Sequence, residues 1–382
     1  MQQNFLITGG AGFIGSHLVS HLLTTFYQND VNIVVVDTLD YAANLSYIHK
    51  YFDDPRLSFY QLNIKDTSSM VEILKRHNIT TVFHLAAKSH VDDSIYNPEL
   101  LVSNNISATT SLAEAIRIYF LALSDFAKAN FKLINISTDE VFGDQNNAIC
   151  PVTENSVYNP SSPYSASKAA SDLILNAYAK TYNINTLTLY LCNNYGPNQY
   201  PEKLVPLCIL SMLDKEPIRL YGDGKQIRNW IYVKDCVQLI TKIYQQWPSI
   251  YGNKVVINGQ SLTNLEITNK ISQALTELRN EERFKIFENL KEDFNEMIEF
   301  TADRPGHDIK YWSSDNLLQS SGIDLPVLDF DAHIKDTIVW YIQNFDTLIE
   351  KVRTFDHRKF NQSSDNLLSL RKGSRKRKNL TL

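Results

Sequence analysis

Cysteine is scarce in this 382-residue sequence, and the few cysteines stand far apart. No Cys-x-x-Cys pair and no other metal-ligand spacing occurs among them, so we expect neither a metal site nor a redox-active dithiol. Scattered single cysteines are typical of a chemically reduced compartment, which predicts a cytoplasmic protein. The four residues are Cys150, Cys192, Cys208 and Cys236.

Long apolar runs and an excess of positive charge are also missing. No stretch of about 18 apolar residues occurs, so we expect no membrane span. The N-terminus leads directly into a short apolar run and lacks the pattern of a secretory signal. With 37 Lys and Arg against 42 Asp and Glu, the body gives no reason to expect nucleic acid. A basic run at 371–378 is typical of a solvated tail, and an anionic partner or a targeting signal is the alternative.

The first forty residues carry the pattern of a dinucleotide-binding turn. A short apolar run at 5–7 predicts a buried strand, and helical spacing begins at residue 16. The turn between them contains Gly9, Gly12, Phe13, Ile14 and Gly15. Glycines let the backbone approach a pyrophosphate, and the helix N-terminus offers free N–H groups. A second apolar run ends at Asp37, whose carboxylate accepts ribose hydroxyls and repels a 2′-phosphate, so NAD is expected over NADP.

Apolar runs alternate with helical patterns through the first 190 residues. Expected strands are 5–7, 33–36, 57–61, 81–85, 132–136 and 186–191, and expected helices are 16–27, 66–77, 98–128 and 162–182. This order predicts an α/β fold with a Rossmann-type, doubly wound parallel sheet over residues 1–197. Closely spaced prolines and shorter elements then predict a smaller, mainly substrate-binding domain over 198–355, from which some segments can return to the first sheet. Residues 356–382 are expected to form a basic, disordered tail.

Two groups of residues in the first half can carry proton chemistry. Tyr164 and Lys168 are one helical turn apart, so the lysine can lower the pKa of the phenol and make it a base. Asp139 and Glu140 can supply an acid and a base, and we expect them just past a strand end at the ligand-binding edge of the sheet. The structural alternative is an ordinary acidic pair at a helix start.

These motifs resemble the nucleoside-diphosphate-glucose 4,6-dehydratases of the extended short-chain dehydrogenase/reductase family. The resemblance runs in order from residue 5 to about 345. The glycine turn and Tyr-x-x-x-Lys belong to the whole superfamily, whereas Thr-Asp-Glu, Tyr-Ala-x-Asn-Leu and Pro-Glu-Lys-Leu are much narrower. The matching segments are 9–15, 37–45, 84–92, 137–143, 163–168, 193–197, 201–204, 222–230 and 303–308.

The resemblance implies a closed redox cycle on one sugar. NAD oxidises C4, water leaves across C5 and C6, and the hydride returns to C6, giving a nucleotide-linked 4-keto-6-deoxyglucose. Tyr164 and Lys168 would act in the oxidation, with Thr138 bonding the C4 oxygen. Glu140 would remove the C5 proton, and Asp139 would protonate the leaving C6 hydroxyl, which requires a raised pKa.

The resemblance also implies binding residues and a partner. Besides the glycine turn, Asp37, Tyr164 and Lys168, the cofactor is expected to contact Asn63, Ile64, Leu85, Ala86, Ala87, Asn104 and Asn194. The nucleotide sugar is expected to contact Ser89, Thr138, Asn193, Lys203, Leu204, Tyr221, Arg228, Asn258, Arg304 and His307. Arginine suits the diphosphate because its planar fork matches phosphate oxygens. The helices 98–128 and 162–182 resemble those that form a homodimer interface.

The chain departs from the family pattern at several positions. Lys88 replaces a common glutamate or glutamine, and 116–128 resembles an insertion. The other departures are Asn63, Tyr190, Cys192, Asn229 and Arg219, which replace a common aspartate, arginine, serine, aspartate and proline. The leading hypothesis is a dTDP-glucose 4,6-dehydratase. The alternatives are the same reaction on UDP-glucose, a nucleotide-sugar 4-epimerase, and a non-catalytic NAD or nucleotide-sugar binding protein.

Overall fold

A seven-stranded parallel sheet forms the centre of the computed structural model, which describes residues 2–26, 31–247, 254–279 and 294–354. The expected tail at 356–382 lies outside the described residues. The strand order is β10-β6-β5-β4-β1-β2-β3, with every neighbouring pair parallel. The strands are β1 Gln3–Thr8, β2 Val31–Asp37, β3 Leu57–Gln61, β4 Thr81–His84, β5 Lys132–Thr138, β6 Thr186–Leu191 and β10 Lys254–Ile257. The predicted α/β fold with a Rossmann-type sheet is confirmed.

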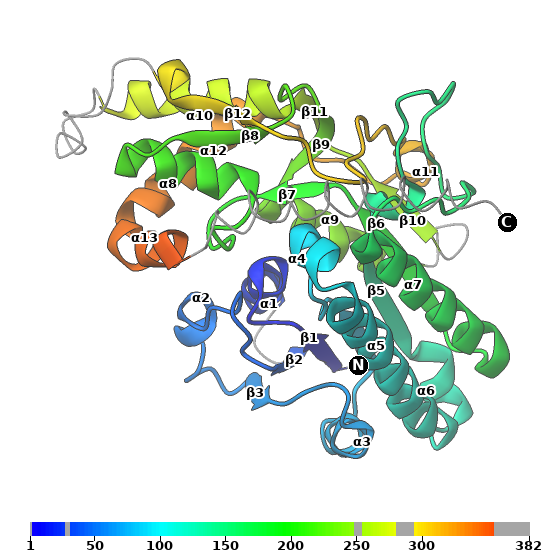
Figure 1. Cartoon of the computed structure of the whole chain (residues 1–382). Helices are drawn as coiled ribbons and strands as arrows, with labels where there is room; N and C mark the ends of the chain where they lie inside the picture. Colours follow the sequence, from blue (N-terminus) through cyan, green and yellow to red (C-terminus); the bar gives the residue numbers. More distant parts are fainter. Residues whose placement is uncertain (1, 27–30, 248–253, 280–293, 355–382) are drawn as a thin grey trace, which may run out of the picture.

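Helices cover both faces of this sheet because its strands bury side chains on both sides. Phe5 and Ile7 pack with α1 and α9, whereas Leu6 between them packs with α3 and α5 on the other face. Figure 1 shows α5 and α7 running side by side along the sheet. The helices of this unit are α1 Phe13–Thr25, α2 Ser46–His49, α3 Thr67–Arg76, α4 Val91–Tyr96, α5 Pro98–Leu121, α6 Asp125–Asn130, α7 Pro163–Tyr182, α9 Val233–Gln245 and α11 Asn316–Ser320.

The prediction of a single helix over 98–128 is wrong, because the structure has two helices there, α5 and α6. Ala122 ends α5, and Ser124 then adopts an extended conformation. The Ser124 side chain accepts a hydrogen bond from the Ala127 amide at 3.3 Å and so caps the start of α6. The Ser-Asp pair at 124–125 is the sequence signal of this second helix start.

A second unit with its own core lies beside the carboxyl ends of the strands (Figure 1). Its sheets have the orders β11-β9-β7 and β12-β8. Their strands are β7 Asn193–Tyr195, β8 Ile218–Tyr221, β9 Ile227–Tyr232, β11 Gln260–Thr263 and β12 Ile298–Thr301. The packed helices are α8 Leu204–Asp214, α10 Asn264–Arg279, α12 Phe330–Gln343 and α13 Phe345–Thr354. Among the described helices, none is long and apolar enough to cross a membrane.

Candidate active site

One large cleft of about 1390 Å³ lies between the two units. Its walls include the glycine turn, the loops after β2 and β4, the end of β5 and the first turns of α7. The expected cofactor residues all line this cleft, as do Ser89, Thr138, Asn193, Lys203, Leu204, Tyr221, Arg228, Arg304, His307 and Glu140. Asp139 and Asn258 are not among its lining residues. The fold therefore brings nearly all of the expected residues to one place, as the ligand-binding edge of a parallel sheet requires.

The glycine turn is shaped for a close approach of the backbone. Gly9 has a φ of +73°, a conformation that favours glycine. A Cβ at Gly15 would lie 2.1 Å from the Gly9 carbonyl oxygen, so only glycine allows α1 to start there. Gly12 precedes the first turn of α1 and lines the cleft. The free N–H groups of this turn fit the pyrophosphate of a dinucleotide.

Two polar side chains in the part of the cleft that contains the glycine turn suit the ribose and the nicotinamide of a dinucleotide. The Asp37 carboxylate accepts hydrogen bonds from the Ala11 and Leu39 amides at 3.0 and 2.9 Å, which fix it beside the glycine turn. Asn194 donates to the Cys192 carbonyl at 3.0 Å, and its buried Oδ1 has no hydrogen-bond partner among the described residues. A buried acceptor of this kind suits an amide donor such as the nicotinamide carboxamide.

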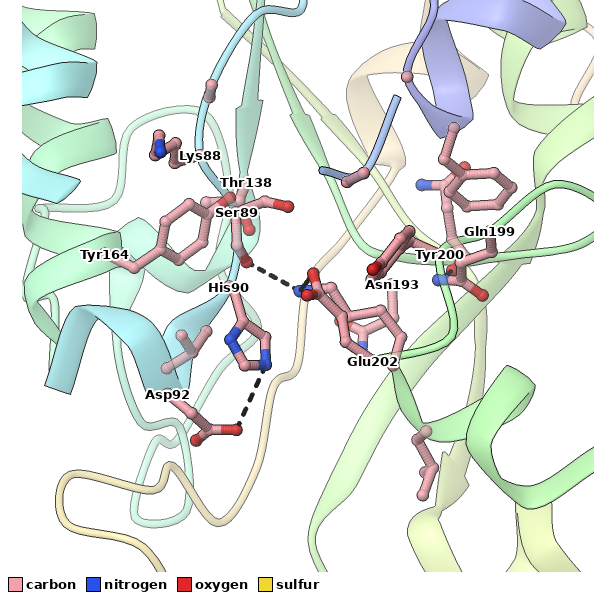
Figure 2. A pocket seen from close by; sticks show the side chains of 18 of the residues that line it. Lys88, Ser89, His90, Asp92, Thr138, Tyr164, Asn193, Gln199, Tyr200 and Glu202 are labelled. Carbon is pink, nitrogen blue, oxygen red and sulfur yellow. Dashed lines mark hydrogen bonds and ion pairs between the residues drawn. The ribbon is translucent and has the colours of Figure 1, made fainter. Parts of the chain in front are cut away.

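The end of β5 and the start of α7 bring together the residues that are expected to transfer protons. Thr138 ends β5, and Asp139 and Glu140 begin the short 3-10 helix η1 Asp139–Phe142. The Glu140 amide donates to Thr138 Oγ1 at 3.3 Å. Figure 2 shows Tyr164 beside Thr138 and Ser89, across the cleft from Asn193 and Glu202. A reciprocal capping box between Ser162 and Ser165 fixes the first turn of α7, which carries Tyr164.

The two adjacent carboxyl groups have raised pKa values. Burial, followed by the neighbouring charge of Glu140, raises the pKa of Asp139 to about 8. Burial also raises the pKa of Glu140, although Arg304 and Lys203 act in the opposite direction. Asp139 therefore holds a proton at neutral pH, which is the state that a general acid needs.

The expected lowering of the Tyr164 pKa is not found. Burial raises this pKa, and the carboxylates of Glu140 and Asp139 raise it further. Lys168 points its ammonium at the Ile136 carbonyl oxygen, 2.8 Å away. The sequence places Lys168 on the correct helix face, but it does not reveal how strongly burial and two nearby carboxylates act on the phenol.

Buried Arg228 and half-buried Arg304 lie at the substrate end of the cleft. Arg228 donates to the carbonyl oxygens of Ile227 and Asp308 at 2.8 and 2.7 Å. Arg304 donates to Asp92 at 3.3 Å, and its buried Nε has no partner among the described residues. His307 lies nearby, where burial, followed by the Arg304 charge, lowers its pKa to about 4. Arg228 and Arg304 therefore bring two guanidinium groups to this end of the cleft, and its histidine is neutral at pH 7.

Several lining residues were missed by the sequence reasoning. Tyr41 donates to Glu202 at 3.2 Å, and Lys88 pairs with Asp40 at 3.1 Å. These contacts join loops that are far apart in the chain, so composition and spacing do not reveal them. All three loops lie within segments that carry the family resemblance, and this was the available signal. Figure 2 also shows His90 pointing toward Asp92.

The other departures from the family pattern have local partners. Tyr190 is hydrogen-bonded to Tyr158 beneath η1. Asn229 donates to Ser313 at 3.2 Å, and Ser313 donates to Asn258 at 3.1 Å. Arg219 lies 3.6 Å from the carboxylate of Glu299. Cys192 is buried among the apolar residues of the core of the large sheet.

Comparisons with known proteins agree with this geometry. The family described as GDP-mannose 4,6 dehydratase matches residues 6–320. A dTDP-glucose 4,6-dehydratase from Neisseria gonorrhoeae is 37% identical and covers 90% of this chain and 96% of its own length. The solved dTDP-glucose 4,6-dehydratase from Streptomyces venezuelae, with NAD bound, has a TM-score of 0.77 and 32% identity, covering 90% of this chain and 98% of its own.

Solved epimerases share the architecture at lower identity. UDP-N-acetylglucosamine 4-epimerase from Methanobrevibacter ruminantium has a TM-score of 0.73 and 26% identity, covering 90% of this chain and all (100%) of its own. The resemblance recognised from the motifs is confirmed by the family match and by the identity to the dehydratases. The chain therefore belongs to this family of nucleotide-sugar 4,6-dehydratases, within the extended short-chain dehydrogenase/reductases.

Proposed function

We propose that the protein is an NAD-dependent dTDP-glucose 4,6-dehydratase, a hydro-lyase that converts dTDP-glucose to dTDP-4-keto-6-deoxyglucose. One observation carries this proposal. Buried Asp139 and the cleft-lining Glu140 follow Thr138 at the end of β5, at the edge of the same cleft as Tyr164. A 4-epimerase needs the tyrosine but has no use for a second acid and base. The dehydratase relatives support the same substrate.

The residues divide the reaction into proton transfers that balance. Tyr164 takes the proton of the C4 hydroxyl as a phenolate, a form that the positive charge of Lys168 must favour against burial and the nearby carboxylates. Thr138 bonds the same C4 oxygen. NAD, when bound, accepts the C4 hydride and later returns it to C6. Glu140 removes the C5 proton, which the new C4 ketone acidifies, while Asp139 gives its proton to the departing C6 hydroxyl as water. When the hydride adds to C6, Glu140 returns a proton to C5. The proton that Tyr164 took from the C4 hydroxyl then passes through solvent to Asp139, so all three groups regain their starting states.

The end of the cleft with the two arginines suits the diphosphate of the substrate. Arg228 and Arg304 can each offer a planar fork of N–H donors to phosphate oxygens. Lys203 donates to the Ser89 carbonyl at 2.8 Å and lies within the same cleft. Neutral His307 can orient the substrate by hydrogen bonding. These donors match the charge of a nucleoside diphosphate sugar.

We further infer a cytoplasmic homodimer. All four cysteines are free, which fits a reducing compartment. Helices α5 and α7 pack together and expose large apolar side chains, including Leu100 and Leu173 with 59% and 58% of their surface accessible. Apolar side chains on adjacent helices are typical of a dimer interface.

The test follows both half-reactions with Glu140→Gln. This variant should still oxidise C4, so enzyme-bound NADH should appear and persist. Elimination should slow by about 10²–10⁴-fold, the usual effect of a positioned acid or base. The comparison variant Tyr164→Phe should form NADH far more slowly. Wild-type turnover by Glu140→Gln would contradict the assigned role of this carboxylate.

The substrate is tested with the wild-type protein. It is incubated separately with dTDP-, UDP-, GDP- and CDP-glucose, and the products are identified by mass. The expected product is a 4-keto-6-deoxy sugar, formed fastest from dTDP-glucose. If UDP-glucose reacts faster, the proposed substrate becomes UDP-glucose instead of dTDP-glucose. An epimerised product that keeps the C6 oxygen would contradict the dehydratase function. Denatured protein should release NAD(H) and not NADP(H).

A further inference from the structure

A buried carboxylate that the reaction above does not use lies one helical turn beyond Lys168. Asp172 is on α7 and is 3% exposed. One of its oxygens accepts a hydrogen bond from Asn135 at 2.7 Å, and the other accepts one from Ser137 at 2.6 Å. Both donors are on β5. A buried carboxylate is costly unless donors or a positive charge compensate it, so this arrangement is specific.

Lys168 is a buried positive charge, which is also costly unless it is compensated. Its side chain is also buried, at 5% exposed, and its ammonium donates to the Ile136 carbonyl oxygen. A carbonyl dipole compensates only part of a buried positive charge. Burial lowers the pKa of Lys168, and Asp172 is the group that raises it again. The carboxylate thus helps to keep a charge on the lysine that stands one turn from Tyr164.

The hydrogen bonds of Asp172 also connect the two elements that carry the reacting groups. Strand β5 ends at Thr138, directly before Asp139 and Glu140. Helix α7 carries Tyr164 and Lys168. Since Asp172 is on α7 and its two donors are on β5, it fixes the helix against the strand.

Other groups face Asp172 from neighbouring elements. Lys254 on β10, Tyr158 and Tyr190 line a small cavity of about 20 Å³ together with Asp172. Lys254 acts to lower the Asp172 pKa, but burial prevails and raises it to about 6. Tyr190 stands where an arginine is common in the family, so this chain has a neutral phenol at that point. Lys168 and Lys254 are consequently the cations that act on Asp172.

We propose that Asp172 is a positioning residue for the oxidation step: its hydrogen bonds to Asn135 and Ser137 fix α7 against β5, and its charge supports the buried Lys168 ammonium. This inference rests on the proposed function only in assigning Tyr164 and Lys168 to the removal of hydrogen from a sugar carbon. Asp172 is not among the residues that line the cleft.

The test uses Asp172→Asn, which keeps the shape and removes the charge. The rate of NADH formation in a single turnover should fall by about 10–10²-fold, the effect of a small misplacement of reacting groups. The signal of Lys168 in NMR spectra of lysine-labelled protein, assigned with Lys168→Met, should titrate about one pH unit or more below its wild-type position. The alkaline limb of the rate profile should move in the same direction.

Two further variants separate charge from packing. Ser137→Ala removes one hydrogen bond to Asp172 but keeps the carboxylate, so it should slow oxidation without moving the Lys168 titration. Asp54→Asn makes the same chemical change in a carboxylate that pairs with Arg56 at 2.7 Å, away from α7, and should leave both readouts unchanged. Thermal unfolding shows whether each variant is folded.

The outcomes distinguish this inference from the proposed function. An Asp172→Asn protein with wild-type oxidation and Lys168 titration would overturn the inference. A slower oxidation with unchanged titration would also overturn the charge-holding role. Wild-type protein that forms NADH but no dehydrated product would reject the dehydratase while leaving the Asp172 test intact.

Discussion

Asp139 and Glu140 are chemically similar residues with different surroundings. The Asp139 side chain lies outside the cleft lining and has a buried Oδ2 without a partner among the described residues, whereas Glu140 faces the cleft and the positive charges of Arg304 and Lys203. Burial therefore favours the neutral form of Asp139 more than that of Glu140, whose charge the cations support. Adjacent acid and base roles follow from one strand end and one short helix.

The first prediction concerns Asp139 and the pH dependence of stability. The Asp139 pKa is about 8 in the folded protein, against an ordinary value of 3.8. Between these values the folded state binds a proton that the unfolded chain has released, so stability falls as pH rises. Asp139→Asn removes this contribution, up to about 1.4 kcal/mol per pH unit.

The measurement is thermal unfolding of both proteins by calorimetry between pH 5 and 8. The stability advantage of Asp139→Asn over the wild type should grow across this range. Asp172 titrates in both proteins, so its contribution cancels in the difference. The charge of Glu140 raises the Asp139 pKa, so the coupling between these two carboxyl groups is part of the measured difference. Two parallel stability curves would contradict a proton on Asp139.

At the residue scale, the sequence allowed the glycine turn, Asp37 and the Thr-Asp-Glu segment to be placed, because each depends on short-range geometry. It did not allow the Tyr164 pKa to be judged, since this depends on burial by distant residues and on carboxylates from another element. The sequence also did not reveal that Lys88 pairs with Asp40, because the two residues follow different strands. The placement of the reacting side chains relative to one another stays a prediction for experiment.

Loops after β2 and β4 meet at the mouth of the cofactor half of the cleft. Asp40 comes three residues after Asp37 at the end of β2, and Lys88 comes four residues after the end of β4. Their ion pair of 3.1 Å crosses between the loops, and both residues line the cleft. The unusual lysine at position 88 thus brings a charge that is paired within the chain.

The second prediction is that this pair helps to retain NAD. The two side chains are 33% and 51% exposed, so solvent screens their attraction. Such pairs contribute about 0.2–1 kcal/mol, and Lys88→Gln should weaken NAD binding by about 1.4- to 5-fold. Calorimetric titration of NAD into protein freed of cofactor measures this, and the difference should shrink at high salt.

A charge exchange and a surface pair provide the controls. The double variant Lys88→Asp with Asp40→Lys restores the pair and should recover much of the lost affinity. Lys225→Gln removes a more exposed pair with Asp223, at 3.3 Å, and should not change NAD binding. If Lys88→Gln and the double variant both bind NAD as the wild type does, the pair has no role in retention.

At the element scale, strands β3 and β6 were predicted with their observed ends, because short apolar runs define them. The division between α5 and α6 was missed. The apolar residues around 116–128 continue a helical spacing, and the interruption depends on the extended backbone at Ser124. Local capping, which periodicity does not measure, determined this boundary.

At the scale of the whole molecule, the chain crosses between the two units more than once. After entering the second unit it returns through α9 and β10, which pairs in parallel with β6 in the large sheet. The strand β10 was not predicted as a separate element, although the sequence analysis allowed segments to return to the first sheet. Its position depends on the edge that β6 leaves available, which the local sequence does not reveal. Both walls of the cleft are consequently anchored in the same sheet.

The last prediction concerns the assembly. We expect the wild type to be a homodimer through α5 and α7, with Leu173 in the interface because it is 58% exposed on a helix otherwise packed against the sheet and α5. Leu173→Glu places a charge in that apolar surface. It should raise the dissociation constant of the dimer by about tenfold or more, the effect of losing a central interface residue.

Light scattering at micromolar concentration measures the mass of each protein. Val327→Glu is the matched control, because Val327 is 83% exposed and precedes α12 in the second unit, away from α5 and α7. This control should remain a dimer while Leu173→Glu dissociates. A wild type of monomeric mass would reject the assembly, and a dimer that Leu173→Glu leaves intact would place the interface on another face. Because Tyr164 and Lys168 lie on the same helix as Leu173, a dimer formed here would also restrain the catalytic end of α7.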